Sequence, residues 1–234
     1  MSTEIFTGRA EAYAKARLSY PEAALDYIGS LIPPDAVFAD IGAGTGKLTL
    51  LLGQRRYPGF AVEPNADMRK QLTSALSPYL HVKIIGGSAE ATTLPDHSVD
   101  VVLCAQALHW FNPEGFRAEC RRICKPGGIV IAVYNVTEEN NSSFHSKSPS
   151  HSKTSAHRFF DSPALQEFAN PQFYTRENWL AYMTSHSHDP LPADAAYAAH
   201  IAEMNEIFDR ESIDGLLRRN VVTEVYSEKI DNLP

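Results

Sequence analysis

Phe38-Ala39-Asp40-Ile41-Gly42-Ala43-Gly44-Thr45-Gly46 is the stretch that decides the fold. An apolar run that starts at Ala36 ends in an acid, and three glycines at alternate positions follow. Lys47 and a group of leucines then open a helix. This order predicts a strand, a glycine turn and a helix, an arrangement in which backbone comes unusually close to a ligand.

The chain around this stretch alternates strands and helices up to residue 134. After the first strand, short apolar segments predict four more, at Phe60–Glu63, His81–Ile85, Asp100–Ala105 and Ile129–Tyr134. Each is separated from the next by a helical segment or a turn. Strands that alternate with helices in this way predict a doubly wound α/β fold with a parallel sheet.

The length and composition exclude several classes of protein. The chain has 234 residues, of which 44% are hydrophobic, enough for one α/β domain with an appended segment. A net charge of -7 argues against a nucleic-acid partner, which calls for a clustered basic face. We find no apolar stretch typical of a secretory signal or a membrane span, so we expect a cytoplasmic protein. The three cysteines lack CxxC spacing and predict reduced structural thiols, with no metal site.

We expect one domain with five parts. These are N-terminal cap helices (1–34), a core (35–134), a flexible loop (135–158), a helical lid (159–215) and a closing strand (216–227). The loop assignment rests on the polar composition of residues 140–156. Three histidines in and beside it (His145, His151, His157) are six residues apart, which favours a solvated loop over a metal site.

Three kinds of nucleotide site could use the glycine turn. Gly46-Lys47 resembles the end of a P-loop, but Ile41 and Leu48 occupy the other defining positions. A dinucleotide fingerprint requires glycine where this chain has Lys47. Asp40 also argues against a ligand with phosphate groups, because a carboxylate at the strand end repels phosphate. The same carboxylate suits a cationic ligand without phosphate.

An acid followed by x-Gly-x-Gly-x-Gly resembles the motif of class I S-adenosylmethionine-dependent methyltransferases. Within that family the chain is most similar to the small-molecule branch that includes trans-aconitate methyltransferases, from about Phe6 to Tyr134. The resemblance implies a Rossmann-like, mostly parallel seven-stranded sheet with a helical lid late in the chain. It also implies S-adenosylmethionine as cofactor, S-adenosylhomocysteine as product, a small-molecule acceptor, and a monomer or homodimer.

The resemblance assigns cofactor contacts to four places along the chain. Glu63 would accept the ribose hydroxyls, although an acid favoured by a helix N-terminus is the alternative. Gln106 would face the methionine part, and residues 88–90 the adenine. The implied cofactor-binding residues are Asp40, Gly42, Gly44, Gly46, Glu63, Ser88, Ala89, Glu90 and Gln106.

The acceptor side is assigned to His109 and to aromatic residues. His109 and Trp110 match a His-Trp pair of this branch, and His109 is the candidate catalytic residue; holding a backbone carbonyl is its alternative role. Residues 13–20 resemble a run that covers the cofactor, but Leu18 replaces the usual proline. The implied substrate-binding residues are Tyr13, Arg17, Tyr20, His109, Trp110, Tyr174 and Tyr182, with Phe173 and Trp179 as further candidates for the pocket lining or for core packing.

The expected reaction is in-line methyl transfer, in which alignment and exclusion of water matter most. A carboxylate acceptor is weakly favoured and needs no general base, because it is ionised at neutral pH. An amine, phenol or carbon acceptor would need one, and His109 titrates in the right range. Two alternatives stay open: a nicotinamide-dependent oxidoreductase, and a non-catalytic S-adenosylmethionine-binding or scaffolding protein.

Overall fold

A computed structural model describes residues 18–137, 151–185 and 189–234. Seven strands form one sheet in the order β3-β2-β1-β4-β5-β9-β6. β9 is antiparallel to both of its neighbours, and the other six strands run in one direction. This confirms the predicted seven-stranded, mostly parallel sheet. The strands are β1 (Phe38–Ile41), β2 (Gly59–Val62), β3 (Val82–Ile85), β4 (Val99–Ala105), β5 (Cys124–Thr137), β6 (Ala164–Ala169) and β9 (Val221–Lys229).

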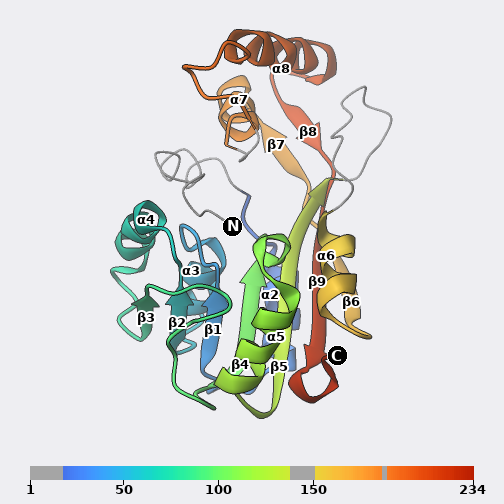
Figure 1. Cartoon of the computed structure of the whole chain (residues 1–234). Helices are drawn as coiled ribbons and strands as arrows, with labels where there is room; N and C mark the ends of the chain where they lie inside the picture. Colours follow the sequence, from blue (N-terminus) through green and yellow to red (C-terminus); the bar gives the residue numbers. More distant parts are fainter. Residues whose placement is uncertain (1–17, 138–150, 186–188) are drawn as a thin grey trace.

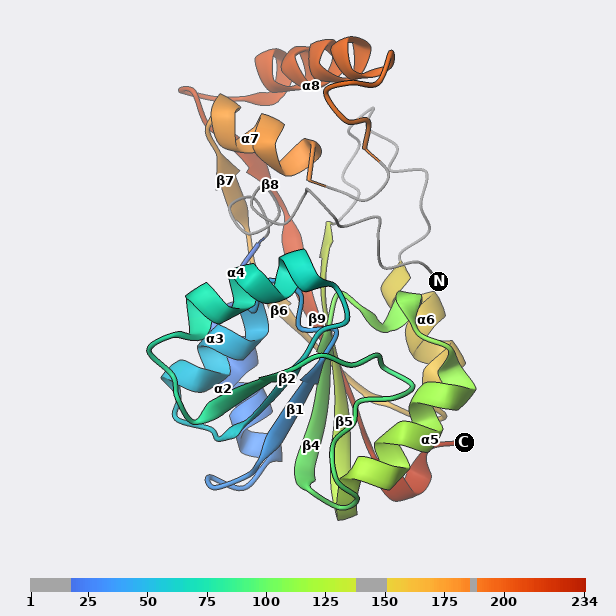
Figure 2. The same cartoon turned by 60° about the vertical axis from the view of Figure 1, so that its left-hand side comes forward.

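Helices cover both faces of the sheet (Figures 1 and 2). One face packs against α2 (Glu22–Leu31), α3 (Lys47–Gln54) and α4 (Ala66–Leu76). The other packs against α5 (Pro113–Ile123) and α6 (His151–Phe159). Two asparagine side chains, Asn65 and Asn112, accept hydrogen bonds from the first backbone N–H groups of α4 and α5, as expected of N-caps.

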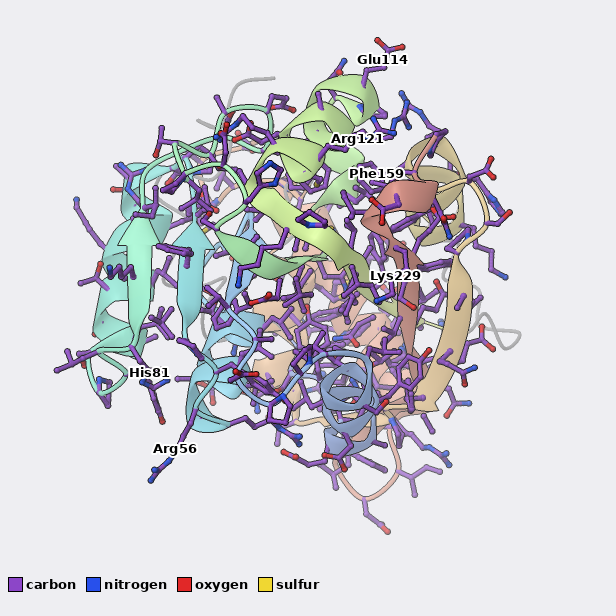
Figure 3. All side chains as sticks on the ribbon, turned by 90° about the horizontal axis from the view of Figure 1, so that it is seen from below. Arg56, His81, Glu114, Arg121, Phe159 and Lys229 are labelled. Atoms are coloured by element: carbon purple, nitrogen blue, oxygen red, sulfur yellow. The ribbon has the colours of Figure 1, made fainter. Side chains whose placement is uncertain are left out.

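Seen from below (Figure 3), Arg121 and Phe159 lie on the α5 and α6 side of the sheet, and Arg56 and His81 on the other. Phe159 is fully buried and stacks on Phe116 of α5. Arg121 Nη2 donates to the carbonyl of Leu233 at 2.7 Å, which ties the last residues to α5. In the described part of the chain, no helix combines the length and apolar character needed to cross a membrane.

A small subdomain stands above the carboxyl ends of the strands (Figures 1 and 2). It contains a two-stranded ribbon, β7 (Gln172–Tyr174) and β8 (Leu217–Arg219), and two helices, α7 (Arg176–Met183) and α8 (Tyr197–Glu211). The short 3-10 helices η2 (Leu108–Trp110) and η3 (Ile230–Asn232) complete the described elements. Seven buried apolar residues give the subdomain a core of its own: Tyr174, Trp179, Met183, Met204, Ile207, Phe208 and Leu217.

The structure corrects three predicted boundaries after residue 134. Residues 151–159 form α6, where we expected loop, because Ala156 and Phe159 bury their side chains against the sheet. The predicted helical lid also contains β6 and β7, of which β6 pairs with β9. The predicted closing strand is divided at Asn220 into β8 and β9. The cap helix expected before residue 18 lies outside the described residues.

Candidate functional site

The turn between β1 and α3 contains three glycines with left-handed backbone. Their φ angles are +69° at Gly42, +57° at Gly44 and +90° at Gly46, where side chains are strained. Two of them also lie against neighbouring side chains. A Cβ on Gly42 would come within 3.1 Å of the Phe111 ring, and one on Gly46 within 2.6 Å of Leu72 Cδ1. Gly42 and Gly46 therefore let the turn pack closely against the residues that flank η2 and against α4.

Gly44 serves another purpose, because its missing side chain leaves open space. A Cβ built there would meet no protein atom within 4 Å. The backbone N–H of Gly44 donates to Glu63 Oε2 at 2.8 Å, which fixes the middle of the turn against the end of β2. The turn thus presents an open backbone surface beside a carboxylate.

Asp40, at the end of β1, is a buried acid with one unpaired oxygen. The residue is 1% exposed, and Thr49 Oγ1 donates to its Oδ2 at 2.5 Å. Its Oδ1 is buried without a hydrogen-bond partner among the described residues. Burial raises the pKa of Asp40 to about 7; the Thr49 hydrogen bond opposes this and the Glu63 carboxylate adds to it. A cation at this point would restore the charged form.

Glu63 lies beside Asp40 because β1 and β2 are adjacent parallel strands whose carboxyl ends meet at one edge. Its two oxygens accept from Gly44 N and Asn65 N, each at 2.8 Å. Arg69 Nη1 donates to the Glu63 carbonyl at 2.7 Å and holds the backbone. Burial raises the pKa of Glu63 although both backbone bonds oppose it. Each carboxylate oxygen keeps the capacity for a second hydrogen bond, so Glu63 can still accept from two hydroxyls.

Residues 88–91, after β3, form a tight turn. Ser88 and Ala91 exchange backbone hydrogen bonds of 3.2 and 3.3 Å, and Ala89 is buried in the core beneath. Glu90 is exposed, and its Oε1 accepts from the Asn112 N–H at 2.9 Å, which joins the turn to the start of α5. The structure thus gives Glu90 a structural partner, and its contact with a cofactor stays a prediction.

Gln106 follows β4 at the level of the glycine turn. It has φ +55°, an uncommon conformation for a residue with a side chain. Two bonds hold it: its N–H donates to the Val133 carbonyl at 2.9 Å, and its Nε2 donates to the Asn135 carbonyl at 3.1 Å. Strain of this kind persists only where the surroundings enforce it, and it is common at functional sites.

His109 and Trp110 belong to η2 at the same edge. Both are half-buried, and their ring centroids lie 5.0 Å apart. The His109 ring also lies 6.3 Å from the ring of Tyr134, whose pKa is raised by burial. His109 therefore lies beyond the carboxyl end of β4, in the segment whose Ala107 and Phe111 flank Gly42, and its catalytic role stays a prediction.

The predicted acceptor residues are less closely grouped. Tyr20 is buried in the core on the α2 face. Tyr174 is buried in the subdomain core with Trp179, and Tyr182 packs against it with ring centroids 5.3 Å apart. Phe173 is 61% exposed on the ribbon. Tyr13 and Arg17 lie outside the described residues.

Sequence reasoning missed four residues at or near this edge. Thr49, which donates to Asp40, is in the sequence only one residue of a leucine-rich helix. Asn135 and Thr223 form a hydrogen bond although they are 88 residues apart in the sequence. Arg219 lies in the segment expected to be one strand. None belongs to a motif, and only contacts across the sheet reveal them. Within the described ranges, no three His, Cys, Asp or Glu side chains gather as metal ligands would, and the cysteines are unpaired.

Comparisons with known proteins agree with this geometry. Residues 39–132 match the family model of a methyltransferase domain. An uncharacterized methyltransferase of Mycobacterium tuberculosis is 41% identical over 129 residues, which cover 55% of this chain and 51% of that protein. A malonyl-[acyl-carrier protein] O-methyltransferase of Methylococcus capsulatus is 33% identical over 111 residues, covering 46% of this chain and 40% of that protein.

A solved, provisionally named type II methyltransferase from Anaeromyxobacter dehalogenans superimposes with a TM-score of 0.70 at 22% identity. The superposition covers 92% of this chain and 98% of that one, which shows a shared fold. The chain spans about half the length of the curated relatives it matches. Residues 39–132 therefore match a methyltransferase domain, and the chain shares the fold of that solved protein.

Proposed function

We propose that this chain, built around a class I methyltransferase domain, is an S-adenosylmethionine-dependent methyltransferase that acts on a small anionic acceptor, with carboxylate O-methylation as the favoured reaction. The observation that carries the cofactor assignment is Asp40 Oδ1 beneath the glycine turn, which is buried and has no hydrogen-bond partner in the described part of the chain. A phosphate-bearing cofactor would add negative charge beside two carboxylates. A sulfonium cofactor brings positive charge and no phosphate.

The residues at the turn fit this cofactor. Asp40 and the open face of Gly44 would form its floor, and Glu63 would accept the ribose hydroxyls. The turn at Ser88–Ala91 would border the adenine. When bound, S-adenosylmethionine supplies a methyl group on a positively charged sulfur that is already a good leaving group. The chain's own residues then have to align the acceptor and exclude water.

Arg219 supports an anionic acceptor. It ends β8, two residues before β9 begins beside Thr137 at the carboxyl edge of β5. Its Nη1 donates to Glu211 Oε2 at 2.7 Å, and its Cζ lies 4.9 Å above the Trp179 ring. Its Nη2 is buried and has no hydrogen-bond partner within the described ranges.

A buried N–H of a charged group left without a partner costs about 1–3 kcal/mol or more. A carboxylate matches the fork of a guanidinium and would satisfy it. The Methylococcus capsulatus relative bears a name that specifies O-methylation and a malonyl group, which ends in a carboxyl. Both points favour a carboxylate acceptor, which needs no general base. His109 remains the candidate base for any acceptor that must lose a proton. We expect the protein to act in the cytoplasm as a monomer or homodimer.

Two measurements test the proposal. Thermal shift with S-adenosylhomocysteine and with NAD(H) should show stabilisation by the first only; the reverse result would refute the cofactor assignment. Methyl-labelled S-adenosylmethionine, incubated with the protein and a metabolite pool, should then give a labelled product detected by mass spectrometry. Loss of the label in mild alkali identifies a carboxyl ester. Cofactor binding without any methylated product would leave a non-catalytic binding protein instead.

A further inference from the structure

Four polar side chains meet where the sheet joins the subdomain. We call them the amide cluster: Asn135, Asn170, Gln172 and Thr223. Thr223 Oγ1 donates to Asn135 Oδ1 at 2.6 Å, and Asn170 Nδ2 lies 3.2 Å from each of these two oxygens. Gln172 Nε2 donates to Asn170 Oδ1 at 2.8 Å. Thr223 is fully buried and the other three side chains are half-buried, so this is a connected and partly buried polar network.

The amide cluster reaches the cofactor side through Gln106. The Asn135 carbonyl accepts the side-chain hydrogen bond that helps to hold Gln106 in its left-handed conformation. Such a conformation is strained and persists only where its surroundings hold it. A shift of Asn135 would therefore release Gln106 toward an ordinary conformation and change the edge beside the glycine turn.

The amide cluster also fixes the segment that precedes α2. The Ser19 carbonyl accepts from Asn135 Nδ2 at 3.1 Å and from Asn170 Nδ2 at 3.0 Å. Ser19 lies next to Tyr20, which enters the core of the α2 face. Two amides from distant parts of the chain thus converge on one backbone oxygen.

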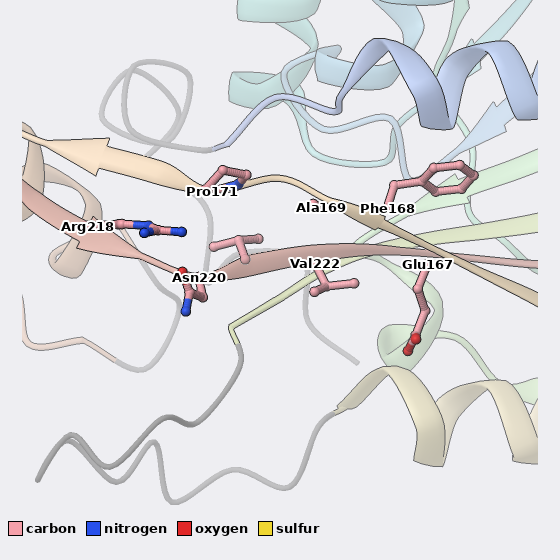
Figure 4. A pocket seen from close by; sticks show the side chains of 8 residues that line it. Glu167, Phe168, Ala169, Pro171, Arg218, Asn220 and Val222 are labelled. Carbon is pink, nitrogen blue, oxygen red and sulfur yellow. The ribbon is translucent and has the colours of Figure 1, made fainter.

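The same residues form the base of the subdomain. The chain enters the subdomain just after Asn170 and leaves it at Asn220, and Thr223 follows in β9. A pocket of about 320 Å³ opens beside this junction. Pro171, Arg218 and Asn220 are among the residues that line it (Figure 4). Beside this pocket, the hydrogen bonds of the amide cluster join the segment that enters the subdomain to β5 and β9.

We propose that the amide cluster is a positioning site that sets the subdomain and residues 18–20 relative to Gln106, so that cofactor binding and subdomain orientation are coupled. The cofactor part of this inference rests on the proposed function. The coupling works in both directions, since two sites that bias one arrangement affect each other equally. A bound cofactor that holds Gln106 would therefore also order the subdomain.

Thr223 offers a matched pair of variants. Thr223→Val keeps the shape and removes only the hydroxyl, whereas Thr223→Ser keeps the hydroxyl. In wild type, S-adenosylhomocysteine should slow hydrogen exchange in residues 176–183 and 197–211. We expect Thr223→Val to lose most of this protection and to bind S-adenosylhomocysteine at least fivefold more weakly, and Thr223→Ser to restore both. Asn170→Ala, at a half-buried position, should repeat the effect if Thr223→Val folds poorly.

Each outcome has a definite reading. If Thr223→Val unfolds more easily but keeps wild-type affinity and ligand-induced protection, the hydroxyl is only structural and the positioning proposal is wrong. Wild-type protein that binds S-adenosylhomocysteine without any change in the subdomain also overturns it. If wild type does not bind S-adenosylhomocysteine, the proposed function fails. Hydrogen exchange in the ligand-free protein then still tests the positioning proposal, because exchange in residues 172–174 and 217–219 should be faster in Thr223→Val than in Thr223→Ser. Equal exchange in the two variants would refute positioning by itself.

Discussion

Replacing Asp40 by asparagine should stabilise the ligand-free protein while it weakens cofactor binding. The side chain keeps its shape and can still pair with Thr49, but it no longer ionises. In wild type the residue is 1% exposed, one carboxyl oxygen has no partner among residues that the structure describes, and the nearby Glu63 carboxylate opposes ionisation. Those conditions disfavour the charged form in the folded state only.

The size of the effect follows from the pKa of Asp40, which moves from 3.8 to about 7 on folding. At about 1.4 kcal/mol per pKa unit, ionising Asp40 lowers the free energy of unfolding by about 4 kcal/mol above pH 7. The sign of this pH effect follows from the number of protons that the folded and unfolded states bind. Between the two pKa values the folded state holds a proton that the unfolded state has lost, so stability falls as pH rises through this window.

Urea unfolding of both proteins at about pH 5 and about pH 8 measures this effect, and wild type should lose about 2–3 kcal/mol relative to Asp40→Asn between them. Calorimetry in two buffers of different ionisation enthalpy should show proton release when wild type binds S-adenosylmethionine below pH 7. Asp40→Asn should bind at least tenfold more weakly. Parallel pH profiles of stability in the two proteins would refute the reasoning.

Three further substitutions test other parts of the site. Gly46→Ala should lower the free energy of unfolding, measured by urea titration, by about 1–3 kcal/mol, because the new Cβ would lie 2.6 Å from Leu72 Cδ1 and the backbone φ is +90°. An unchanged free energy of unfolding would mean that the turn relaxes around the added methyl group. Glu63→Gln should weaken S-adenosylhomocysteine binding about tenfold or more by calorimetry, because an amide nitrogen would face an N–H donor. Arg219→Met should lower kcat/KM for a carboxylate acceptor about 10- to 100-fold, because a charged hydrogen bond to the acceptor is lost, and should leave S-adenosylhomocysteine affinity unchanged. An equal loss of both quantities would show that Arg219 does not act on the acceptor specifically.

The core was predictable because its signals are local. The glycine turn, the apolar run of β4 and the cap at Asn112 each identify an element without knowledge of its neighbours. Parallel pairing then places the ends of adjacent strands side by side, which is why Asp40 and Glu63 could be expected to meet.

The later part of the chain was less predictable, since its elements depend on distant partners. β6 is an edge strand whose side chains are mostly exposed, so it shows no alternation of apolar and polar residues. It forms a strand because its backbone pairs with β9. The strain at Gln106 and the amide cluster are likewise invisible in sequence, because they arise from contacts between segments up to 151 residues apart.

The place of β9 has a consequence for the order in which the molecule can be completed. β9 lies between β5 and β6 and supplies every sheet hydrogen bond that β6 makes. β6 is translated more than 50 residues before β9, yet it has no place in the sheet until β9 has added to β5. During synthesis, β1 to β5 can therefore assemble around the glycine turn early, whereas β6 and the base of the subdomain wait. A mutation that disrupts only β9 would then leave the strands around the glycine turn assembled and would prevent β6 and the base of the subdomain from forming.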